Sequence, residues 1–204
     1  MIVMSFYPES EPVPDELRTA DLLLRMLSPE HVHMDYEAVM ESQEQLRRFS
    51  AGSWPAPDFT LEQNIGDLEE HEREHHERVA FTYTVMNPKG TRCEGCVYIN
   101  PWTDALSHRH INATVDDVTF GEHEAVVTFW VRTSGFERGL DRQLLDGLLG
   151  WFDAEWSFSK ITCMTNDGLE RQMELMEEAG LERRYSFGNS TVQTTWHFYS
   201  RVNE

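Results

Sequence analysis

The sequence predicts an α/β or α+β fold, in which helices pack against a sheet that contains one crossover connection. Apolar residues alternate through the middle of the chain, as in an antiparallel hairpin. The C-terminal half alternates predicted strands with predicted helices, as in a crossover unit. The 204 residues, 40% of them hydrophobic, are enough for a substantial core. No repeat or linker divides the interior, so we expect an N-terminal arm over residues 1–17 and a single domain over residues 18–204.

The predicted domain begins with a strand that is followed by helices. Residues 22–27 are apolar apart from one arginine, which favours a strand. Ser28 and Pro29 open the next helix, because serine is preferred at the N-cap and proline at the first helical position. We expect this helix to reach Met40 and a second, shorter helix to reach Phe49.

The middle of the chain changes from helix to sheet. Thr60 and Gln63 form a capping box at the start of a helix that is expected to end near Arg78. Its apolar positions recur on one side, at Leu61, Ile65, Leu68 and Val79. Residues 80–86 and 91–100 then alternate as strands and predict a hairpin.

The C-terminal half alternates strands and helices around a glycine-containing turn. We assign residues 101–122, which are polar and irregular, only a loop with a short strand at 115–119. The further elements expected are a buried strand over 124–132, a helix over 140–152, a strand over 160–165, a helix over 169–179, and strands over 181–187 and 191–199.

The chain is strongly acidic, with 36 Asp and Glu against 17 Lys and Arg and a formal net charge of −19. Such a charge repels phosphate backbones and anionic lipids, so nucleic-acid and membrane-surface partners are disfavoured. Two interpretations of the charge stay open, namely adaptation to salt and attraction of a cationic substrate.

The sequence carries no recognisable targeting segment. No basic residue precedes Arg18, and Ser5 and Pro8 break the short apolar run at the N-terminus, so we expect no secretory signal. No uncharged apolar run approaches the ~18–20 residues of a membrane span. Three cysteines, an odd count, give no disulfide framework. We therefore expect an acidic cytoplasmic protein.

The strongest functional signal is the turn between the predicted strand 124–132 and the helix after it. Arg132, Arg138, Gly139 and Arg142 gather around the first turn of that helix. Free backbone N–H groups, the positive end of the helix dipole and guanidinium groups all favour a bound anion. We expect an anion site here, in a protein otherwise short of positive charge.

This turn resembles that of the GCN5-related N-acetyltransferases (GNAT), in which a strand leads into an Arg/Gln-x-x-Gly-x-Gly/Ala turn that holds the pyrophosphate of acetyl-CoA. Residues 161–166 resemble the next strand of the family, which ends in asparagine, and residues 173–181 resemble its following helix. The order of elements extends the resemblance over residues 18–200. It implies a GNAT-like, mostly antiparallel twisted sheet flanked by helices, with splayed central strands.

The phosphate motif is degenerate at both ends. Phe136 stands at its first position instead of Arg or Gln, and Asp141 stands at its last, where the family has Gly or Ala. The Asp141 carboxylate would repel pyrophosphate unless it turns away, toward Arg142 or Arg138. Two positions that are catalytic in some members also differ, being Met176 and Val126 here.

The resemblance implies that an acetyl group moves from acetyl-CoA, the cosubstrate, to a primary amine by direct attack. Backbone groups of the splayed strand would bind pantetheine, and one N–H would stabilise the oxyanion. The cofactor contacts that it implies are Trp130, Val131, Arg132, Thr133, Arg138, Gly139, Leu140, Asp141, Arg142 and Asn166.

The attacking amine must be neutral, which requires a base or a water relay. The candidate catalytic residues are Glu124, Glu94, and His108 or His110. A solvated strand end is the competing explanation for Glu124. The acceptor is a small-molecule or peptide amine of unknown identity, and the acidity of the chain favours a cationic one. A monomer and a homodimer both remain open.

A second motif suggests a different class of enzyme. His71-Glu72-Arg-Glu-His75 matches the H-E-x-x-H of zinc hydrolases, in which two histidines one helical turn apart bind the metal. The helix is densely charged, however, and a third ligand is missing unless it is Glu94. We therefore expect a structural or surface helix and no metal.

Two further alternatives concern the expected hairpin and the fold. Cys93 and Cys96 lie in one predicted strand, on opposite faces unless Gly95 makes a bulge, and are best interpreted as small buried residues. Within the fold, the alternative to catalysis is a degenerate GNAT protein that binds an acyl-CoA, or nothing, without reaction.

Overall fold

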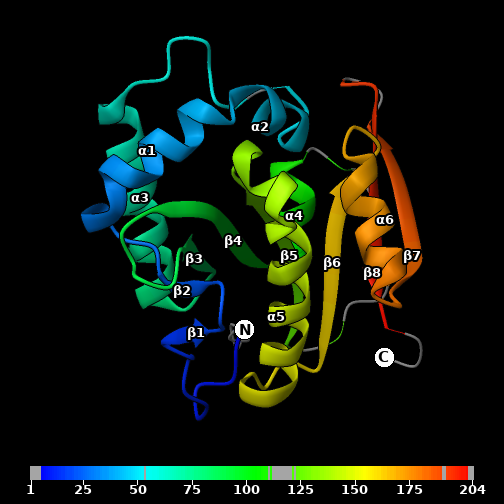
Figure 1. Cartoon of the computed structure of the whole chain (residues 1–204). Coiled ribbons are helices and arrows are strands. Elements are labelled where there is room, and N and C mark those ends of the chain that lie inside the picture. The colour runs from blue at the N-terminus through cyan, green and yellow to red at the C-terminus, as the bar shows by residue number, and fades with distance from the viewer. Residues whose placement is uncertain are drawn as a thin grey trace.

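The centre of the molecule is an eight-stranded sheet in the order β1-β2-β3-β4-β5-β6-β8-β7 (Figure 1). Among the described strands β5 and β6 are the parallel pair, and the other neighbours are antiparallel. This arrangement confirms the mixed, mostly antiparallel sheet that we expected. The computed structural model describes residues 6–52, 54–109, 111, 121, 123–189 and 192–201.

The elements follow the predicted order, with two additions. The strands are β1 Glu16–Arg18, β2 Leu23–Met26, β3 Phe81–Met86, β4 Cys93–Pro101, β5 Glu124–Val131, β6 Lys160–Asn166, β7 Glu182–Asn189 and β8 Thr194–Ser200. The helices are η1 Pro29–His31, α1 Val32–Glu41, α2 Gln43–Phe49, α3 Leu61–Glu77, α4 Trp102–His108, η2 Thr133–Arg138, α5 Leu140–Glu155 and α6 Glu170–Glu178.

The additions are β1 and α4. β1 forms at the end of the expected arm and pairs with β2, and Tyr7 is fully buried, so the described part of the arm packs on the core. Helix α4 lies in the segment for which the sequence predicts a loop, and Trp102 and Ala105 bury its inner face. The short strand expected at 115–119 lies outside the described residues.

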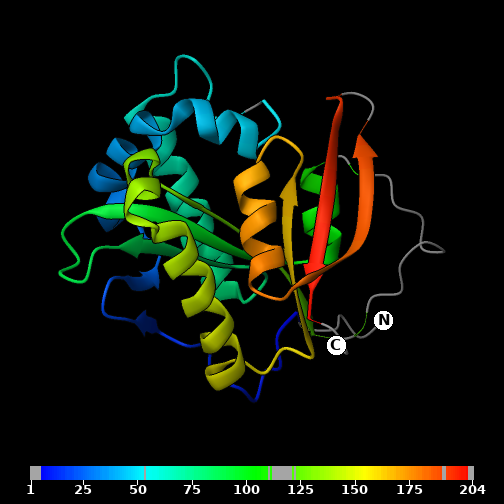
Figure 2. The same ribbon diagram turned by 45° about the vertical axis from the view of Figure 1, so that its right-hand side comes forward.

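Helices cover both faces of the sheet. Helices α5 and α6 pack on one face, which the alternate β5 residues Ala125, Val127, Phe129 and Val131 also line (Figures 1 and 2). Helices α1, α2 and α3 pack with Trp130 on the other face, and α4 packs with Val126 there. Successive apolar side chains of β5 therefore pack on opposite faces of the sheet.

The two central strands separate before they end. The pairing of β5 with β6 stops at Val127 and Cys163, although β5 continues to Val131 and β6 to Asn166. The predicted splay is confirmed, and it leaves backbone groups of β5 without a partner strand at the end nearest to α2 and η2.

A bulge in β4 decides the positions of the two cysteines. The register shifts so that Val85 faces Gly95 and Met86 faces Cys93, which leaves Glu94 as the extra residue. Cys93 and Cys96 are consequently both buried in the cluster beneath α1, α2 and α3, and both thiols are free. The interpretation as small buried residues is confirmed.

Within the described ranges, no helix is long and apolar enough to cross a membrane.

Candidate active site

Three cavities lie in line at the splay between β5 and β6. The outer groove, of about 570 Å³, opens between α2, η2 and the start of α6. The neck, of about 50 Å³, lies against Phe129 to Val131 of β5, and the α3-side cavity, of about 420 Å³, lies on the opposite face of the sheet. Gln45 and Phe136 line both groove and neck, while Phe49 and Trp130 line both neck and α3-side cavity. Neighbouring cavities of this series therefore share walls.

Two glutamine side chains cross the neck. Gln172 Nε2 on α6 donates to the backbone oxygen of Phe129 at 2.9 Å, and Gln45 Nε2 on α2 donates to that of Val131 at 3.2 Å. Thr165 donates to Gln172 Oε1 at 2.7 Å and holds this side chain in place. The strand carbonyls that lost their partner at the splay are therefore satisfied by side-chain amides.

The three arginines predicted to bind an anion are each paired with a carboxylate. Arg132 is 1% exposed, and its guanidinium donates to Cys93 O at 2.9 Å and to Glu41 at 2.9 Å, among other partners on α1. Arg138 donates to Glu94 at 2.7 Å. Arg142 pairs with Glu178 of α6. Arg132 thus ties β4 to α1, while Arg138 and Arg142 stay half-exposed at the start of α5.

The start of α5 remains open to an anion in spite of the altered motif. Gly139 adopts a left-handed conformation, with φ of 68°, no side chain caps the helix, and the space beside this glycine is empty. Asp141 lines the neck and pairs with Arg171 of α6, and not with Arg142 or Arg138 as expected. Leu140 is buried, so only its backbone faces this end.

The arginines of the outer groove were not found from the sequence. The Arg48 and Arg171 side chains are 59% and 53% exposed, and they pair with Glu44 and Asp141 respectively. The Arg171 guanidinium also lies 5.3 Å from the ring centre of Phe136. Arg48 precedes the turn by about ninety residues and Arg171 follows it by about thirty, so no local motif links them to it.

Two more of the predicted cofactor residues have structural partners. The Thr133 N–H donates to Ser42 Oγ at 3.1 Å, and the Thr133 side chain lies at the outer groove. Asn166 is buried and donates to the carbonyls of Arg48 and Phe49 at 3.0 and 3.3 Å. Asn166 therefore holds the end of α2 in place and does not line any of the three cavities.

The predicted catalytic residues do not converge on one point. Glu124 begins β5 at its closed end and accepts a hydrogen bond from Gly121 N at 2.9 Å. Glu94 is 2% exposed and bridges Arg138 and Arg92, so it stabilises the turn. His108 lines the α3-side cavity. His110 lies outside the described residues.

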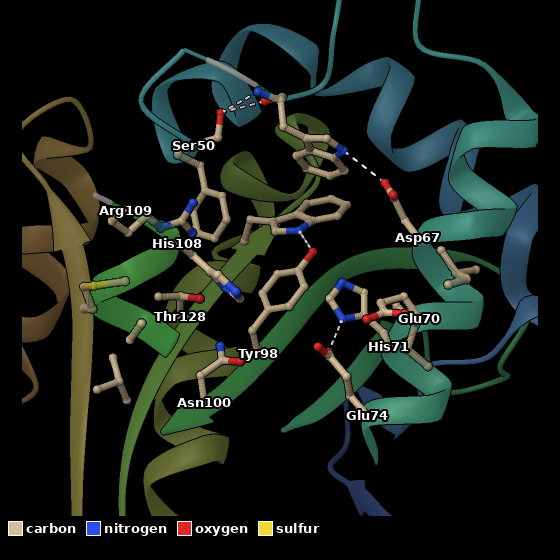
Figure 3. A pocket seen from close by; sticks show the side chains of 18 of the residues that line it. Ser50, Asp67, Glu70, His71, Glu74, Tyr98, Asn100, His108, Arg109 and Thr128 are labelled. Atoms are coloured by element: carbon tan, nitrogen blue, oxygen red, sulfur yellow. Dashed lines mark hydrogen bonds and ion pairs between the residues drawn. The ribbon is translucent and has the colours of Figure 1, made fainter. Parts of the chain in front are cut away.

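Polar and aromatic groups converge in the α3-side cavity (Figure 3). The carboxylates are Asp35 from α1 and Asp67, Glu70 and Glu74 from α3. Burial raises the pKa of Asp35 and of Asp67. The hydrogen bond from His71 lowers the pKa of Glu74, although burial opposes it. Trp54, Tyr98 and Trp130 supply apolar walls.

The H-E-x-x-H motif is divided between this cavity and the core. His71 faces the α3-side cavity, and its Nδ1 lies 3.2 Å from Glu74. His75 packs against the rings of Phe81 and Tyr83, and burial lowers its pKa to about 4. Among the residues that the structure describes, no three His, Cys, Asp or Glu side chains converge as a metal site would require.

The site residues fit a coenzyme A thioester in part. The outer groove offers two exposed guanidiniums beside an uncapped helix start, which suits phosphates. The strand carbonyls at the neck already accept bonds from amides, the group that pantetheine carries. The neck itself admits an acyl chain only after Gln45 and Gln172 move.

Comparisons with known proteins agree on the architecture. No protein-family model matches the chain, and no curated protein matches it significantly. Among solved structures, the RimL ribosomal L7/L12 alpha-N-protein acetyltransferase in complex with coenzyme A has a TM-score of 0.70 at 12% identity, over 92% of this chain and 98% of its own. The ribosomal-protein-S5-alanine acetyltransferase from Vibrio fischeri gives 0.69 at 14%, over 94% and 98%.

A third similar structure is a self-immunity enzyme. The microcin C7 self-immunity acetyltransferase MccE, in complex with acetyl-CoA and AMP, gives a TM-score of 0.69 at 11% identity, over 90% of this chain and 93% of its own. At these identities the likeness establishes a shared fold along nearly the whole of each chain.

Proposed function

We propose that this chain, which has the fold of the GNAT N-acetyltransferases, transfers an acetyl group from acetyl-CoA to a primary amine. The observation that carries the proposal is the series of cavities where β5 and β6 separate. A groove with arginines adjoins a neck lined by strand carbonyls, and the neck adjoins a polar cavity. Two of the compared structures hold coenzyme A or acetyl-CoA, which supports the same cosubstrate here.

The outer groove would bind the anionic end of the cosubstrate. Arg48 and Arg171 lie at its opposite sides, on α2 and α6, and guanidinium groups suit phosphate because they can donate two parallel hydrogen bonds. The N–H groups at the start of α5 add a second, uncharged anion site. The phosphates compete with Glu44 and Asp141 for these arginines, so we expect modest affinity that falls with salt.

The neck would hold the pantetheine arm. Acetyl-CoA supplies an acyl carbon that its thioester activates. When Gln172 and Gln45 release Phe129 O and Val131 O, amides of the arm can replace them, so that each carbonyl keeps a hydrogen bond. In the absence of cosubstrate, the two glutamines would fill the neck and supply hydrogen bonds to the carbonyls of Phe129 and Val131.

The amine would approach from the α3-side cavity, since that cavity meets the neck at Trp130. Its nitrogen forms the new C–N bond while the thioester C–S bond breaks. Holding both reactants at the splay makes this step effectively intramolecular, which contributes a large part of the acceleration.

A second candidate function is favoured by the size of the neck. At about 50 Å³ it is closed by two glutamines, and Phe136 and Asp141 replace the usual motif residues next to it. A chain in which these side chains never move would bind an acyl-CoA in the outer groove without reaction.

Calorimetry and a coenzyme A release assay separate the two candidates. We expect acetyl-CoA to bind, and Arg171→Ala and Arg48→Ala each to weaken binding about tenfold, the usual effect of one charged hydrogen bond. Arg184→Ala, on β7, is the matched control and should bind normally. Release should then be measured with amines, polyamines, aminoglycosides and peptides with free N-termini. Binding without release supports the second candidate, while the absence of binding up to millimolar acetyl-CoA contradicts both.

A further inference from the structure

We propose that the α3-side cavity binds a small cationic amine and that His71, oriented by Glu74, accepts the proton which this amine loses as it attacks. The proposal rests on the proposed acetyl transfer and names the substrate class and the base of that same site. It assigns a role to a histidine that the sequence associated only with zinc.

The cavity combines acidic and aromatic groups, as a cation requires. Asp35, Asp67 and Glu74 line it, and among the described residues none of the three pairs with a lysine or arginine. Trp54 and Trp130 present ring surface to the same space. Carboxylates without a lysine or arginine partner and aromatic faces both attract an ammonium group. The volume of about 420 Å³ suits a small molecule.

An unpartnered hydroxyl marks where the amine nitrogen would sit. Thr128 is 4% exposed, lines the cavity, and makes no side-chain hydrogen bond to any described residue. Its hydroxyl points into the cavity, between His108 and Asn100 (Figure 3). Thr128 is also the first β5 residue beyond the last pair with β6, so this hydroxyl lies at the opening of the splay. It can accept a hydrogen bond from the nitrogen that attacks through the opening.

His71 is arranged as a proton acceptor. Its Nδ1 lies 3.2 Å from Glu74, with Thr82 Oγ1 at 3.4 Å, and the carboxylate places the ring proton on this nitrogen. Nε2 is left with its lone pair and, within the described chain, without a partner. The ring lies 5.4 Å from the Tyr98 ring, whose hydroxyl accepts a hydrogen bond from Trp130 Nε1 at 3.3 Å. Tyr98 thus lies between His71 and Trp130, which lines the neck, so the proton would reach His71 through water in the cavity.

Several charged and titratable groups face His71. Those facing it across the cavity are Asp35 from α1, Asp67, Glu70 and Glu74 from α3, Tyr98 from β4, and His108 and Arg109 from α4 and its end. Arg109 is the one fixed positive charge in this set, and it lies over the rings of Phe49 and Trp196. Asp35, Asp67 and Glu74 have no lysine or arginine partner among the described residues, while Glu70 pairs with Arg73. Carboxylates therefore outnumber fixed positive charges around the cavity.

The proton balance of the step is complete. The ammonium carries three protons and the amide product keeps one. One proton passes to His71 Nε2 and from there to solvent. The other passes to the sulfur of coenzyme A, which leaves with the electron pair of the broken C–S bond.

A binding experiment tests the cation site without any reaction. Calorimetry at pH 7 should compare phenethylamine with phenethyl alcohol, which has a similar size and no charge. We expect the amine to bind at least tenfold more tightly, and Asp67→Asn to remove most of that difference. Asp146→Asn, an exposed carboxylate on α5, is the control. Equal affinity for amine and alcohol would overturn the cation site, whatever the result for acetyl-CoA.

A kinetic experiment tests the base. With acetyl-CoA and phenethylamine or putrescine, His71→Gln should lower kcat by about a hundredfold, the low end of general-base effects, and abolish the acidic limb of the kcat/KM profile. Glu74→Gln should retain the limb and lower kcat by less than His71→Gln does, because the ring keeps its lone pair but loses the carboxylate that orients it. The KM for the amine should rise, because the cavity loses a carboxylate. His76→Gln, exposed on the same helix, should change none of these.

The affinity of each variant for acetyl-CoA keeps the two proposals apart. We expect the affinity for acetyl-CoA to stay within about twofold of that of the unaltered protein, since none of His71, Glu74 and His76 lines the groove or the neck. The base assignment is overturned if the limb survives in His71→Gln, if His108→Gln removes it instead, or if neither amine reacts while acetyl-CoA binds. A protein that binds the amine but not acetyl-CoA contradicts the proposed function and leaves the cation site standing.

Discussion

Single carboxylates decide how this molecule can receive an anion. Asp141 occupies the place where a small residue would let a phosphate approach, and its charge is cancelled by Arg171. Only one partner of this ion pair is buried: Asp141 is 3% exposed, while the Arg171 side chain is 53% exposed. Arg171 can therefore exchange its carboxylate for a phosphate, but Asp141 would then be left buried without a partner.

Removing that carboxylate should strengthen anion binding and weaken the fold. In Asp141→Asn, Arg171 is freed for phosphate, and one negative charge disappears beside it. We expect the dissociation constant of coenzyme A to fall severalfold, and the free energy of unfolding to fall by about 1 kcal/mol, a surface-type value because Arg171 is half-exposed. Calorimetry and urea denaturation measure the two effects. Asp146→Asn on the same helix should produce neither, and weaker coenzyme A binding in Asp141→Asn would show that Asp141 supports the ligand.

His75 should make stability depend on pH. Its Nδ1 is buried without a partner in the described structure, and burial lowers its pKa to about 4 from a usual value of 6.5. Between these values the unfolded chain binds a proton that the folded chain refuses, so stability falls as pH drops from about 6.5 to 4. The loss is on the order of 2–3 kcal/mol.

His75→Phe isolates this contribution, because phenylalanine fits among the rings of Phe81 and Tyr83 and cannot take up a proton. Urea denaturation at several pH values should show a flatter loss of stability below pH 6.5 in the variant. His76→Gln is exposed and should keep the slope of the unaltered protein. An unchanged slope in His75→Phe would mean that His75 is protonated in the folded state.

At the scale of elements, the close approach of β4 to β5 depends on one glycine. A Cβ built on Gly95 would lie 2.0 Å from the backbone oxygen of Trp130 and 2.9 Å from Val131 Cα. Both contacts are with backbone, so neither can be relieved by a change of rotamer. The bulge at Glu94 and this contact together position the end of β5 that lines the neck.

Gly95→Ala should therefore push β5 away from β4. We expect a loss of at least about 2 kcal/mol in the free energy of unfolding, as for overpacked cores. Gly150→Ala is the matched control, because its Cβ meets nothing within 4 Å and alanine favours the interior of α5. That variant should gain about 0.5–1 kcal/mol. A loss in Gly95→Ala no larger than about 0.5 kcal/mol would show that the strands can separate freely.

Elements with a periodic pattern or a cap were predictable, and those defined by distant contacts were not. The capping box of Thr60 and Gln63 forms as expected, and α3 begins at Leu61. Strand β1 has only three residues and forms through its pairing with β2. No local sequence pattern in β1 predicts that pairing. Helix α4 is held mainly by Trp102 packing on Phe198 of a strand almost a hundred residues later.

The site divides in the same way. The turn after β5 and the open start of α5 were visible from Gly139 and its neighbours. The pairing of Arg132, Arg138 and Arg142 with carboxylates was not, because Glu41, Glu94 and Glu178 come from three other elements. The role of His71 could not be predicted, because its partner Glu74 is one turn away on the same helix but six other elements also line the cavity that it faces.

For the molecule as a whole, the net charge of −19 is unevenly distributed over the two faces of the sheet. Acidic residues neutralise the arginines around the start of α5, and on the other face three carboxylates of the α3-side cavity, Asp35, Asp67 and Glu74, have no lysine or arginine partner among the described residues. The cavities of the two faces share Phe49 and Trp130. The distribution favours a weakly held anionic cosubstrate on one face and a cationic acceptor on the other.

The most direct test of the account is an NMR titration of the unaltered protein with coenzyme A, read at each backbone amide. We predict saturable shifts concentrated at residues 129–131, where the neck runs along β5, and at residues 139–142, where α5 begins. The side-chain amides of Gln45 and Gln172 should shift with them, because both must leave the strand. The account is contradicted if these resonances stay unchanged up to millimolar coenzyme A, or if the saturable shifts lie on a surface away from the splay.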